Sequence, residues 1–314
     1  MPHHQFKPIN AYCSIGNAGG VQRQMSGRMQ IIGFLAAVVS FIGWRILTLP
    51  VRRHTVDDVL RLIKSNVVSD AALVAFRCAC TAIIAFTLVS IAIDKTGINV
   101  CVCLVDQSFK RMRLVGRQRF YTFTVWAWIG QGMYFAAVLL LHVIGPNRSP
   151  PILAEAATVL FEIGLALAML VSFIVTYVLI PGSPDPENFF TWQALAMHNL
   201  NVAFMVAELI LNQVEFDVAR HFHFALLYGV AYILFAWVIA RHHGCYFYFF
   251  LNPNYKHALL AHIGLLVILT TFFCLAALAS VALNPEQNAL AIPVLLSFTA
   301  ALCTFRPRHK LVTA

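Results

Sequence analysis

Long runs of apolar residues constrain this chain more than any other feature of its sequence. A helix that crosses a bilayer needs roughly 20 mainly apolar residues, because the hydrocarbon layer is about 30 Å thick and a helix rises about 1.5 Å per residue. Seven segments meet that length, near 30–49, 71–93, 121–144, 152–180, 189–213, 223–241 and 257–283. An eighth, 289–305, offers only about 17 residues and contains Pro293, so it could instead re-enter the bilayer or lie in the interface.

Composition agrees with this interpretation. The 314 residues are 60% hydrophobic and 11% charged, whereas about 25% of the residues in an average soluble domain are charged. Strands of a membrane barrel would show alternating apolar and polar residues, and these segments do not alternate. The sequence therefore predicts an all-α, polytopic transmembrane helix bundle, with one membrane domain at 30–305 between tails at 1–29 and 306–314.

The formal charge of +9 is explained by topology rather than by a nucleic-acid partner. Of the 22 Lys and Arg residues, 14 fall on one side of the expected membrane and 6 on the other, if the eighth segment crosses. The richer side holds the N-terminus and loop 94–120, with its basic run at 109–119. Because positive charge accumulates in cytoplasmic loops, we expect a cytoplasmic or matrix-side N-terminus. No nucleic acid is expected as a partner; membrane lipids are.

The sequence gives less information about the membrane in which the protein resides. Residues 1–56 contain no acidic residue and carry several Arg, Ser and Gly, which weakly resembles a mitochondrial presequence. An endomembrane or plasma-membrane location is the expectation, with the mitochondrial inner membrane as the alternative. The eight cysteines show no zinc-ribbon spacing and predict no disulfide framework.

Polar residues inside the spans are the informative ones, because each is costly in a bilayer and needs a partner. At about 100° per residue, one face of the fifth span gathers polar side chains within roughly 80°. Its members are His198, Asn201, Met205, Glu208 and Asn212, and Asn199 lies beside them. This face should point into the bundle. It can serve either as a hydrogen-bond network that holds helices together or as the wall of a wet cavity.

Two carboxylates share a face of the fourth span. Glu155 lies near the end of the span and Glu162 lies deeper. The simplest expectation is that Glu162 pairs with Arg77 or Arg45, the two arginines inside other spans.

The remaining histidines lie mostly at the expected membrane edges, at 221–223, 241–243 and 257. They form none of the histidine boxes of a di-iron site, and no matched pair indicates a haem. Interfacial histidines are more often only polar or cationic. No metal and no cofactor is expected.

Three patches of sequence carry a resemblance to a known family. They are FTVWAWIGQGMYF at 123–135, WQALAMHNLNVAFMVAE at 192–208 and YILFAWVIARHHGCYFYFFL at 232–251. Together they resemble the androgen-induced-gene family of multi-span membrane proteins. Some members of this family hydrolyse fatty acid esters of hydroxy fatty acids through an intramembrane threonine and histidine. The resemblance covers about 71–283, which is six spans.

The resemblance implies roles for particular residues. In the first patch, Thr124 is followed seven residues later by Gln131, which is the family spacing, so Thr124 matches the nucleophile. In the second patch, Trp192, His198 and Glu208 keep the family intervals, and His198 matches the catalytic histidine. The third patch matches the family Y-I-L, Gly and Y-x-F-L pattern, and its expected role is packing or the rim of a lipid site.

The chemistry suits this placement. A threonine hydroxyl needs a general base within hydrogen-bonding reach, and His198 is the histidine clearly inside the central spans. We expect Thr124 rather than Thr122 to face it, within about 4 Å or through one water, a few ångströms below the headgroups. Such a site suits a lipid ester substrate. Candidates for binding the substrate or its oxyanion are Gln131, Asn199, Asn201 and Glu208.

Two alternatives remain open at this point. The chain has Leu195 where a second family histidine is common, and it adds spans near 30–49 and 289–305. These departures favour a non-catalytic subunit that retains the family fold and binds partners in a larger membrane complex. A third interpretation is a proton or small-solute carrier that uses the stripe of His198 and Glu208.

Overall fold

The computed structural model describes residues 20–49, 55–183, 185–212, 214–283 and 290–305, with side chains from residue 27 onward. Within these residues, seven helices are long and apolar enough to cross a membrane. They are α1 (Gly20–Thr48), α3 (Asp70–Ile93), α4 (Phe123–Ile144), α5 (Pro151–Ile174) with α6 (Ile180–Gly182), α7 (Trp192–Leu195) with α8 (Asn201–Asn212), α9 (Val218–His243) and α10 (Ala258–Ala282). The prediction of an all-α polytopic bundle is confirmed, and the protein is membrane-embedded.

Two further helices are shorter. The helix α2 (Val56–Ile63) begins with a capping box, in which Thr55 and Asp58 each bond the other's backbone N–H. The helix α11 (Ala291–Leu302) has 12 residues, which gives a length of about 18 Å. The predicted eighth segment, 289–305, therefore contains a helix too short to cross by itself. This helix packs against α5, α8 and α10.

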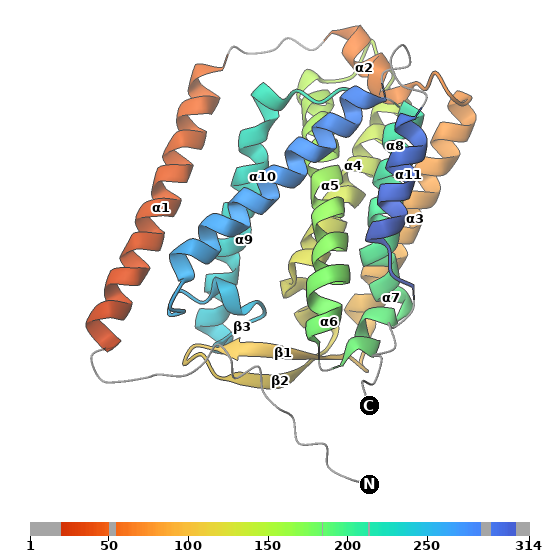
Figure 1. Ribbon diagram of the computed structural model, residues 1–314. Helices are drawn as coiled ribbons and strands as arrows, with labels where there is room; N and C mark the ends of the chain where they lie inside the picture. The colour runs from red at the N-terminus through yellow and green to blue at the C-terminus, as the bar shows by residue number, and fades with distance from the viewer. Residues whose placement is uncertain (1–19, 50–54, 184, 213, 284–289, 306–314) are drawn as a thin grey trace.

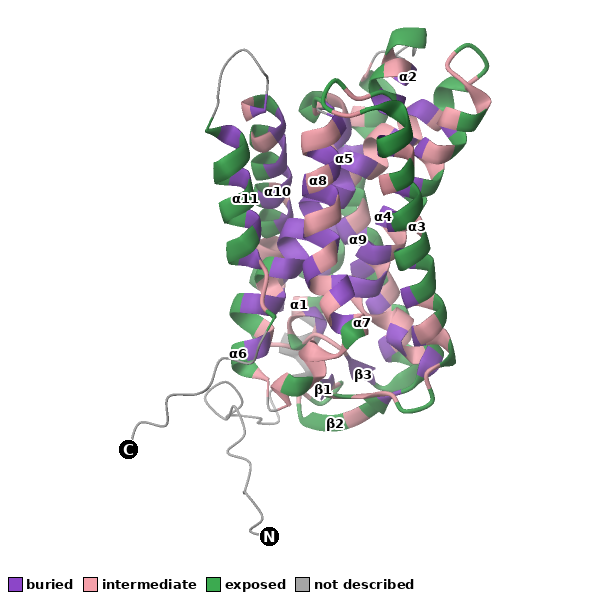
Figure 2. Cartoon of the chain, turned by 90° about the vertical axis from the view of Figure 1, so that its right-hand side faces the viewer, coloured by how far each residue is buried: buried purple, intermediate pink, exposed green. Residues whose placement is uncertain are grey.

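The helix α5 forms the centre of the bundle. It packs against α4, α8, α9 and α10, and Figure 2 shows buried residues along much of its length. Its residues 161–172 are all buried, and they include small residues such as Gly164 and Ala168. Small side chains allow neighbouring helices to approach closely, and the carboxylates Glu155 and Glu162 of this helix need polar partners that lipid cannot supply. The sequence of α5 therefore explains why this helix lies in the interior of the bundle.

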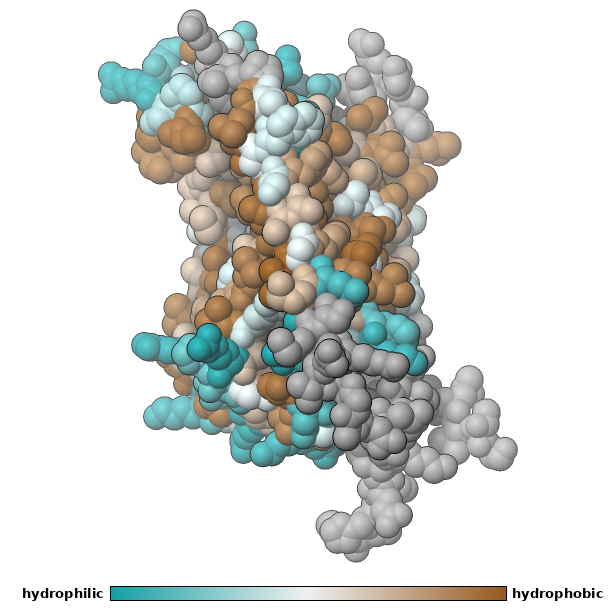
Figure 3. All heavy atoms as spheres, turned by 90° about the vertical axis from the view of Figure 1, so that its left-hand side faces the viewer, coloured by the Kyte–Doolittle hydropathy of each residue, from teal (hydrophilic) through white to brown (hydrophobic). Residues whose placement is uncertain are grey.

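The helix α1 lies at the edge of the bundle, where it packs on α9 and α10 (Figure 1). Seen from that edge, the surface carries an apolar band between hydrophilic ends (Figure 3). This is the distribution that a bilayer imposes on the outside of a protein, because lipid-facing side chains must be apolar and charged groups must reach the water.

The region 94–120 is not a plain loop. It forms an antiparallel hairpin of β1 (Ile98–Leu104) and β2 (Phe109–Leu114), and β3 (Cys245–Tyr246) extends the sheet in the order β2-β1-β3. Gly97 precedes the hairpin at φ +67°, and a Cβ there would collide with the Leu114 carbonyl. Residue 97 must therefore be glycine, because its backbone comes too close to the Leu114 carbonyl for any side chain to fit. The sequence patterns did not predict these strands, because hydropathy marked the region only as a basic loop.

The sheet leads directly into the third span. After β2, a short 3₁₀ helix (Gly116–Tyr121) precedes α4. Arg119 in this turn forms an ion pair of 3.0 Å with Asp94, which follows α3. Hydrogen bonds from Thr96 are the main reason that the pKa of Asp94 is lowered, and Arg119 contributes to the same shift. The carboxylate therefore remains charged at neutral pH and fixes the position where α4 begins.

Candidate functional site

Thr124 is the second residue of α4 and lies inside the bundle. Its side chain is 9% exposed. The other candidate nucleophile, Thr122, precedes the helix, and its hydroxyl donates to the Arg119 carbonyl at 2.9 Å. The first four backbone N–H groups of a helix have no partner within the helix, so Thr124 sits where amide donors and the positive end of the helix dipole are available. Both features stabilise negative charge on a nearby oxygen.

Tyr248, in the segment between α9 and α10, lies against Thr124. Burial raises the pKa of Tyr248 to about 12, while the Phe123 backbone and the hydroxyls of Thr124 and Tyr232 oppose this rise as hydrogen-bond partners. The phenol is therefore protonated at neutral pH and can donate a hydrogen bond. From the sequence, Tyr248 was only a member of the third patch, with an expected role in packing or in the rim of a lipid site.

His198 lies in a π-helical turn, Ala196–Leu200, between α7 and α8. Turns of this kind occur often at functional sites. The Ser172 hydroxyl of α5 donates to the His198 carbonyl. The His198 ring lies 5.9 Å from that of Phe189, and its Nδ1 atom is buried with no hydrogen-bond partner. No described carboxylate bonds the ring, so the structure adds no third member to the predicted pair.

Two contacts show how α4 lies against α8. The Tyr134 hydroxyl donates to Glu208 Oε1 at 2.6 Å. The Trp128 ring stacks on the Phe204 ring with centroids 6.0 Å apart. In both pairs the α8 residue follows the α4 residue by a similar interval in the sequence, so the two helices run parallel.

A sequence interval of similar size separates Thr124 from His198. The two residues should therefore lie at a similar depth along the parallel helices. Both residues belong to the end of the bundle that carries the sheet, where α4 and α7 begin (Figure 1). The π-helical turn that holds His198 packs against α4. Among the described residues no hydrogen bond joins the Thr124 hydroxyl to the His198 imidazole, so their direct or water-bridged contact stays a prediction.

Unpaired polar atoms gather on the interior face of α4. Trp128 Nε1 and both polar atoms of the Gln131 side chain are buried without a hydrogen-bond partner. With Thr124, these residues occupy positions i, i+4 and i+7, which form one face of a helix. An unpaired buried polar group costs about 1–3 kcal/mol, and in native proteins it usually marks a bound water, an ion or a functional role.

Gln131 and Met205 of α8 both lie next to Gly164 of α5. A Cβ added at Gly164 would lie 3.6 Å from Gln131 Cγ and 3.2 Å from Met205 Cε. The predicted polar face of the fifth span, which includes Met205, therefore meets the Gln131 face of α4 inside the bundle.

The two asparagines near His198 differ in their surroundings. Asn201 Oδ1 accepts from the Val202 N–H at 2.6 Å and lies 3.0 Å from the Ser172 hydroxyl, whose single proton it shares with the His198 carbonyl. Its Nδ2 has no acceptor among the described residues. Asn199 bonds the backbone of Thr304, donating to its carbonyl at 2.9 Å and accepting from its N–H at 3.2 Å. Asn201 thus keeps a donor for a ligand, whereas Asn199 anchors the segment after α11.

Glu208 occupies a network of its own. Its carboxylate accepts from Arg77 Nε at 3.1 Å, from the Tyr134 hydroxyl at 2.6 Å and from Asn212 Nδ2 at 3.4 Å. Arg77 and Asn212 also donate to the Leu62 carbonyl of α2. These contacts tie α2, α3, α4 and α8 together. The structure therefore gives Glu208 a clear structural role.

Glu162 does not pair with Arg77 or Arg45, so that expectation is wrong. Its Oε1 atom accepts from the Asp217 N–H and contacts His221 Nδ1, each at 2.9 Å. His221 Nε2 lies 3.1 Å from Glu155, so the fully buried His221 ring bridges the two carboxylates. The sequence placed His221 at a membrane edge. The one available signal was that Glu155 and Glu162 share a helix face and need a common partner.

Comparison of this chain with known proteins identifies no relative. No family model, no curated protein and no solved structure matches this chain. Within the described residues, no group of three or more His, Cys, Asp or Glu side chains is arranged to hold a metal ion.

Proposed function

We propose that this protein is an integral-membrane hydrolase of lipid esters, of the class of fatty acid esters of hydroxy fatty acids, with Thr124 as nucleophile and His198 as general base. The proposal is supported by the buried side chain of Thr124 and by the His198 imidazole, whose Nδ1 atom is buried without a partner, because these residues belong to elements that pack together. The resemblance of the three sequence patches to threonine hydrolases supports the choice of substrate class.

The reaction proceeds through an acyl-enzyme. The Thr124 hydroxyl attacks the ester carbonyl as its proton passes to His198, and a bond forms between Thr124 Oγ1 and the carbonyl carbon. The hydroxy fatty acid leaves and takes the proton from His198. Water then attacks the acyl-threonine while His198 removes its proton, which releases the second fatty acid and restores the free Thr124 hydroxyl.

Several donors are available for the oxyanion that forms at the carbonyl oxygen. The Tyr248 phenol lies against Thr124, and Gln131 and Asn201 each have an amide nitrogen without an acceptor. Donors that are fixed before the reaction stabilise developing charge most strongly in a site that excludes water. The unpaired atoms of Trp128 and Gln131 suit the polar lining of a chamber that admits the single water of deacylation.

The test is ester cleavage by purified protein in nanodiscs, followed by mass spectrometry of the released fatty acids. Thr124→Ala and His198→Ala should each abolish turnover, and the double variant should lose no more than either single one, because nucleophile and base act as a unit. Thr124→Ser should retain activity. A fluorophosphonate probe, which reacts with activated hydroxyls, should label the wild type and miss Thr124→Ala.

Two further variants sharpen the assignment. Thr122→Val is the matched control, since the Thr122 hydroxyl is bound to the Arg119 carbonyl, and it should leave turnover unchanged. Tyr248→Phe keeps the ring and removes one donor, so turnover should fall by roughly a hundredfold. The melting temperature of every variant controls for folding.

A different outcome would favour an alternative function. A wild-type protein that shows neither cleavage nor labelling, and that purifies with stoichiometric membrane partners, would be a non-catalytic subunit. A carrier that uses Glu208 has less support, because that carboxylate is held by Arg77, Tyr134 and Asn212.

A further inference from the structure

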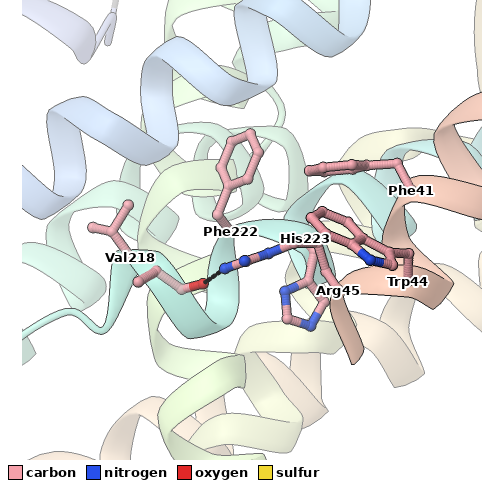
Figure 4. A pocket seen from close by; sticks show the side chains of 7 residues that line it. Phe41, Trp44, Arg45, Val218, Phe222 and His223 are labelled. Atoms are coloured by element: carbon pink, nitrogen blue, oxygen red, sulfur yellow. Dashed lines mark hydrogen bonds between the residues drawn. The ribbon is translucent and has the colours of Figure 1, made fainter. Parts of the chain in front are cut away.

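A second site lies between α1 and α9, at the end of the bundle opposite the sheet. Here the last turns of α1 face the first turns of α9 across a pocket of about 350 Å³. Figure 4 shows its lining from both helices. The residues are Phe41, Trp44 and Arg45 of α1 and Val218, Ala219, Phe222 and His223 of α9. Thr124 lies near Tyr248, beyond the other end of α9, so this pocket is separate from the proposed ester site.

Arg45 supplies a positive charge to the pocket. Its Nη2 atom donates to the Ala219 carbonyl at 2.7 Å, which holds the guanidinium across the space between the helices (Figure 4). The guanidinium also lies 6.0 Å from the centre of the Trp44 ring. No acidic side chain of the described chain pairs with Arg45. Its remaining N–H donors are therefore available to an anion.

His223 supplies a second polar group. The side chain is 2% exposed, and its Nδ1 atom is buried with no hydrogen-bond partner. Figure 4 shows the imidazole beside Arg45 in the floor of the pocket. His223 lines the same pocket as Arg45, so an anion in the pocket meets both side chains, and an imidazole that is held away from water needs a polar partner. An arginine and an imidazole that face one space are suited to phosphate or carboxylate oxygens.

The rest of the lining is apolar and aromatic. Phe41, Trp44 and Phe222 form walls on both helices (Figure 4). Trp44 is exposed near the end of its span, the position where tryptophan marks the boundary between hydrocarbon and headgroups. A ligand here must therefore combine an anionic group with an apolar body, and it must reach the pocket from the bilayer.

We propose that this pocket binds the headgroup of an anionic membrane phospholipid, with its phosphate on Arg45 and His223 and its acyl chains along the outer surface of α1 and α9. Phospholipids surround the protein at high concentration and meet both requirements. The seven lining residues include no carboxylate, so the ammonium group of a zwitterionic headgroup would find no counter-charge among them. This lining selects the anionic phospholipid over phosphatidylcholine.

Native mass spectrometry of the full-length protein tests this proposal. Protein in detergent is titrated with phosphatidylglycerol, phosphatidylcholine or oleate, and the bound lipid is counted. The wild type should retain phosphatidylglycerol about tenfold more strongly than phosphatidylcholine. Arg45→Gln keeps a donor for the Ala219 carbonyl but removes the charge, and it should weaken phosphatidylglycerol retention by about tenfold. His223→Gln should weaken it less, because the cation remains.

Arg241→Gln is the matched control, since Arg241 is an exposed arginine at the other end of α9. It should retain the lipid as the wild type does. If Arg45→Gln does not fold, Arg45→Lys replaces it; this variant keeps the charge but loses the paired N–H donors, so its affinity should be intermediate. Three results would each overturn the proposal. The wild type could retain phosphatidylcholine as strongly as phosphatidylglycerol, the Arg45 and His223 variants could bind phosphatidylglycerol as strongly as the wild type, or the wild type could retain oleate in preference to phosphatidylglycerol.

Discussion

Arg77 of α3 and Glu208 of α8 form an ion pair in the interior of the bundle, and both side chains are fully buried. The pair does not stand alone, because Tyr134 and Asn212 donate to the same carboxylate and Arg77 donates to the Leu62 carbonyl. Removing two charges from water is costly, and their attraction offsets this penalty only when further hydrogen bonds complete the geometry. Arg77 and Glu208 therefore depend on each other.

This dependence predicts the stability of variants. Glu208→Ala should lower the free energy of unfolding by about 3–5 kcal/mol, because it leaves the Arg77 charge buried and unpaired. Arg77→Met combined with Glu208→Leu should recover most of that loss. The measurement is denaturant-induced unfolding in mixed micelles. Asp185→Asn, which breaks the exposed pair with Arg111, should cost less than about 1 kcal/mol. Equal losses for the buried and exposed pairs would contradict the argument.

The carboxylates on either side of His221 should differ in importance. Glu162 is fully buried and contacts both the Asp217 N–H and His221, whereas the Glu155 side chain is 23% exposed. Glu162→Gln should lower the melting temperature clearly more than Glu155→Gln, because water can compensate for a lost contact only at the exposed site. Thermal melting of the two purified variants makes the comparison. A larger fall in melting temperature for Glu155→Gln than for Glu162→Gln would show that burial does not decide which carboxylate contributes more to stability.

The charge distribution predicts which side of the membrane the sheet occupies. Arg28, near the start of α1, bonds Asn254 at 2.8 Å, and Asn254 bonds Val105 beside the hairpin. The start of α1 and the sheet therefore share one end of the bundle (Figure 1). By the excess of positive charge, this end should be cytoplasmic or on the matrix side.

Labelling with a membrane-impermeant maleimide tests this topology. After the exposed native cysteines are replaced by serine, Lys110→Cys on β2 should react only when the reagent reaches the cytosol or the matrix. Arg148→Cys, in the turn between α4 and α5 at the other end, should react only from the opposite compartment. Both positions are exposed. The reverse pattern would invert the topology and with it the side from which the proposed Thr124 site is reached.

Local sequence was enough to predict the membrane fold. Each span is specified by about 20 consecutive apolar residues, so the helices could be placed without knowing how they pack. The helical repeat of about 100° also placed Thr124 and Gln131 on one face of α4 and gathered the polar residues of the fifth span on another. For both faces the structure agrees, since Gln131, Asn201 and Glu208 are all buried.

Pairing between distant residues could not be predicted in this way. Arg77 and Glu208 are 131 positions apart, and Glu162 and His221 are 59 apart. A single sequence shows that each of these side chains needs a partner, but the packing of the helices selects which one it meets. The pairing of β3 with β1 and the pocket between α1 and α9 depend on the same packing.

Which residues cross the membrane and which faces are polar can thus be read from the chain itself, because those properties are periodic and local. Which polar groups are paired and which remain available for a ligand follows from the folded bundle alone, because it depends on contacts between helices far apart in the chain.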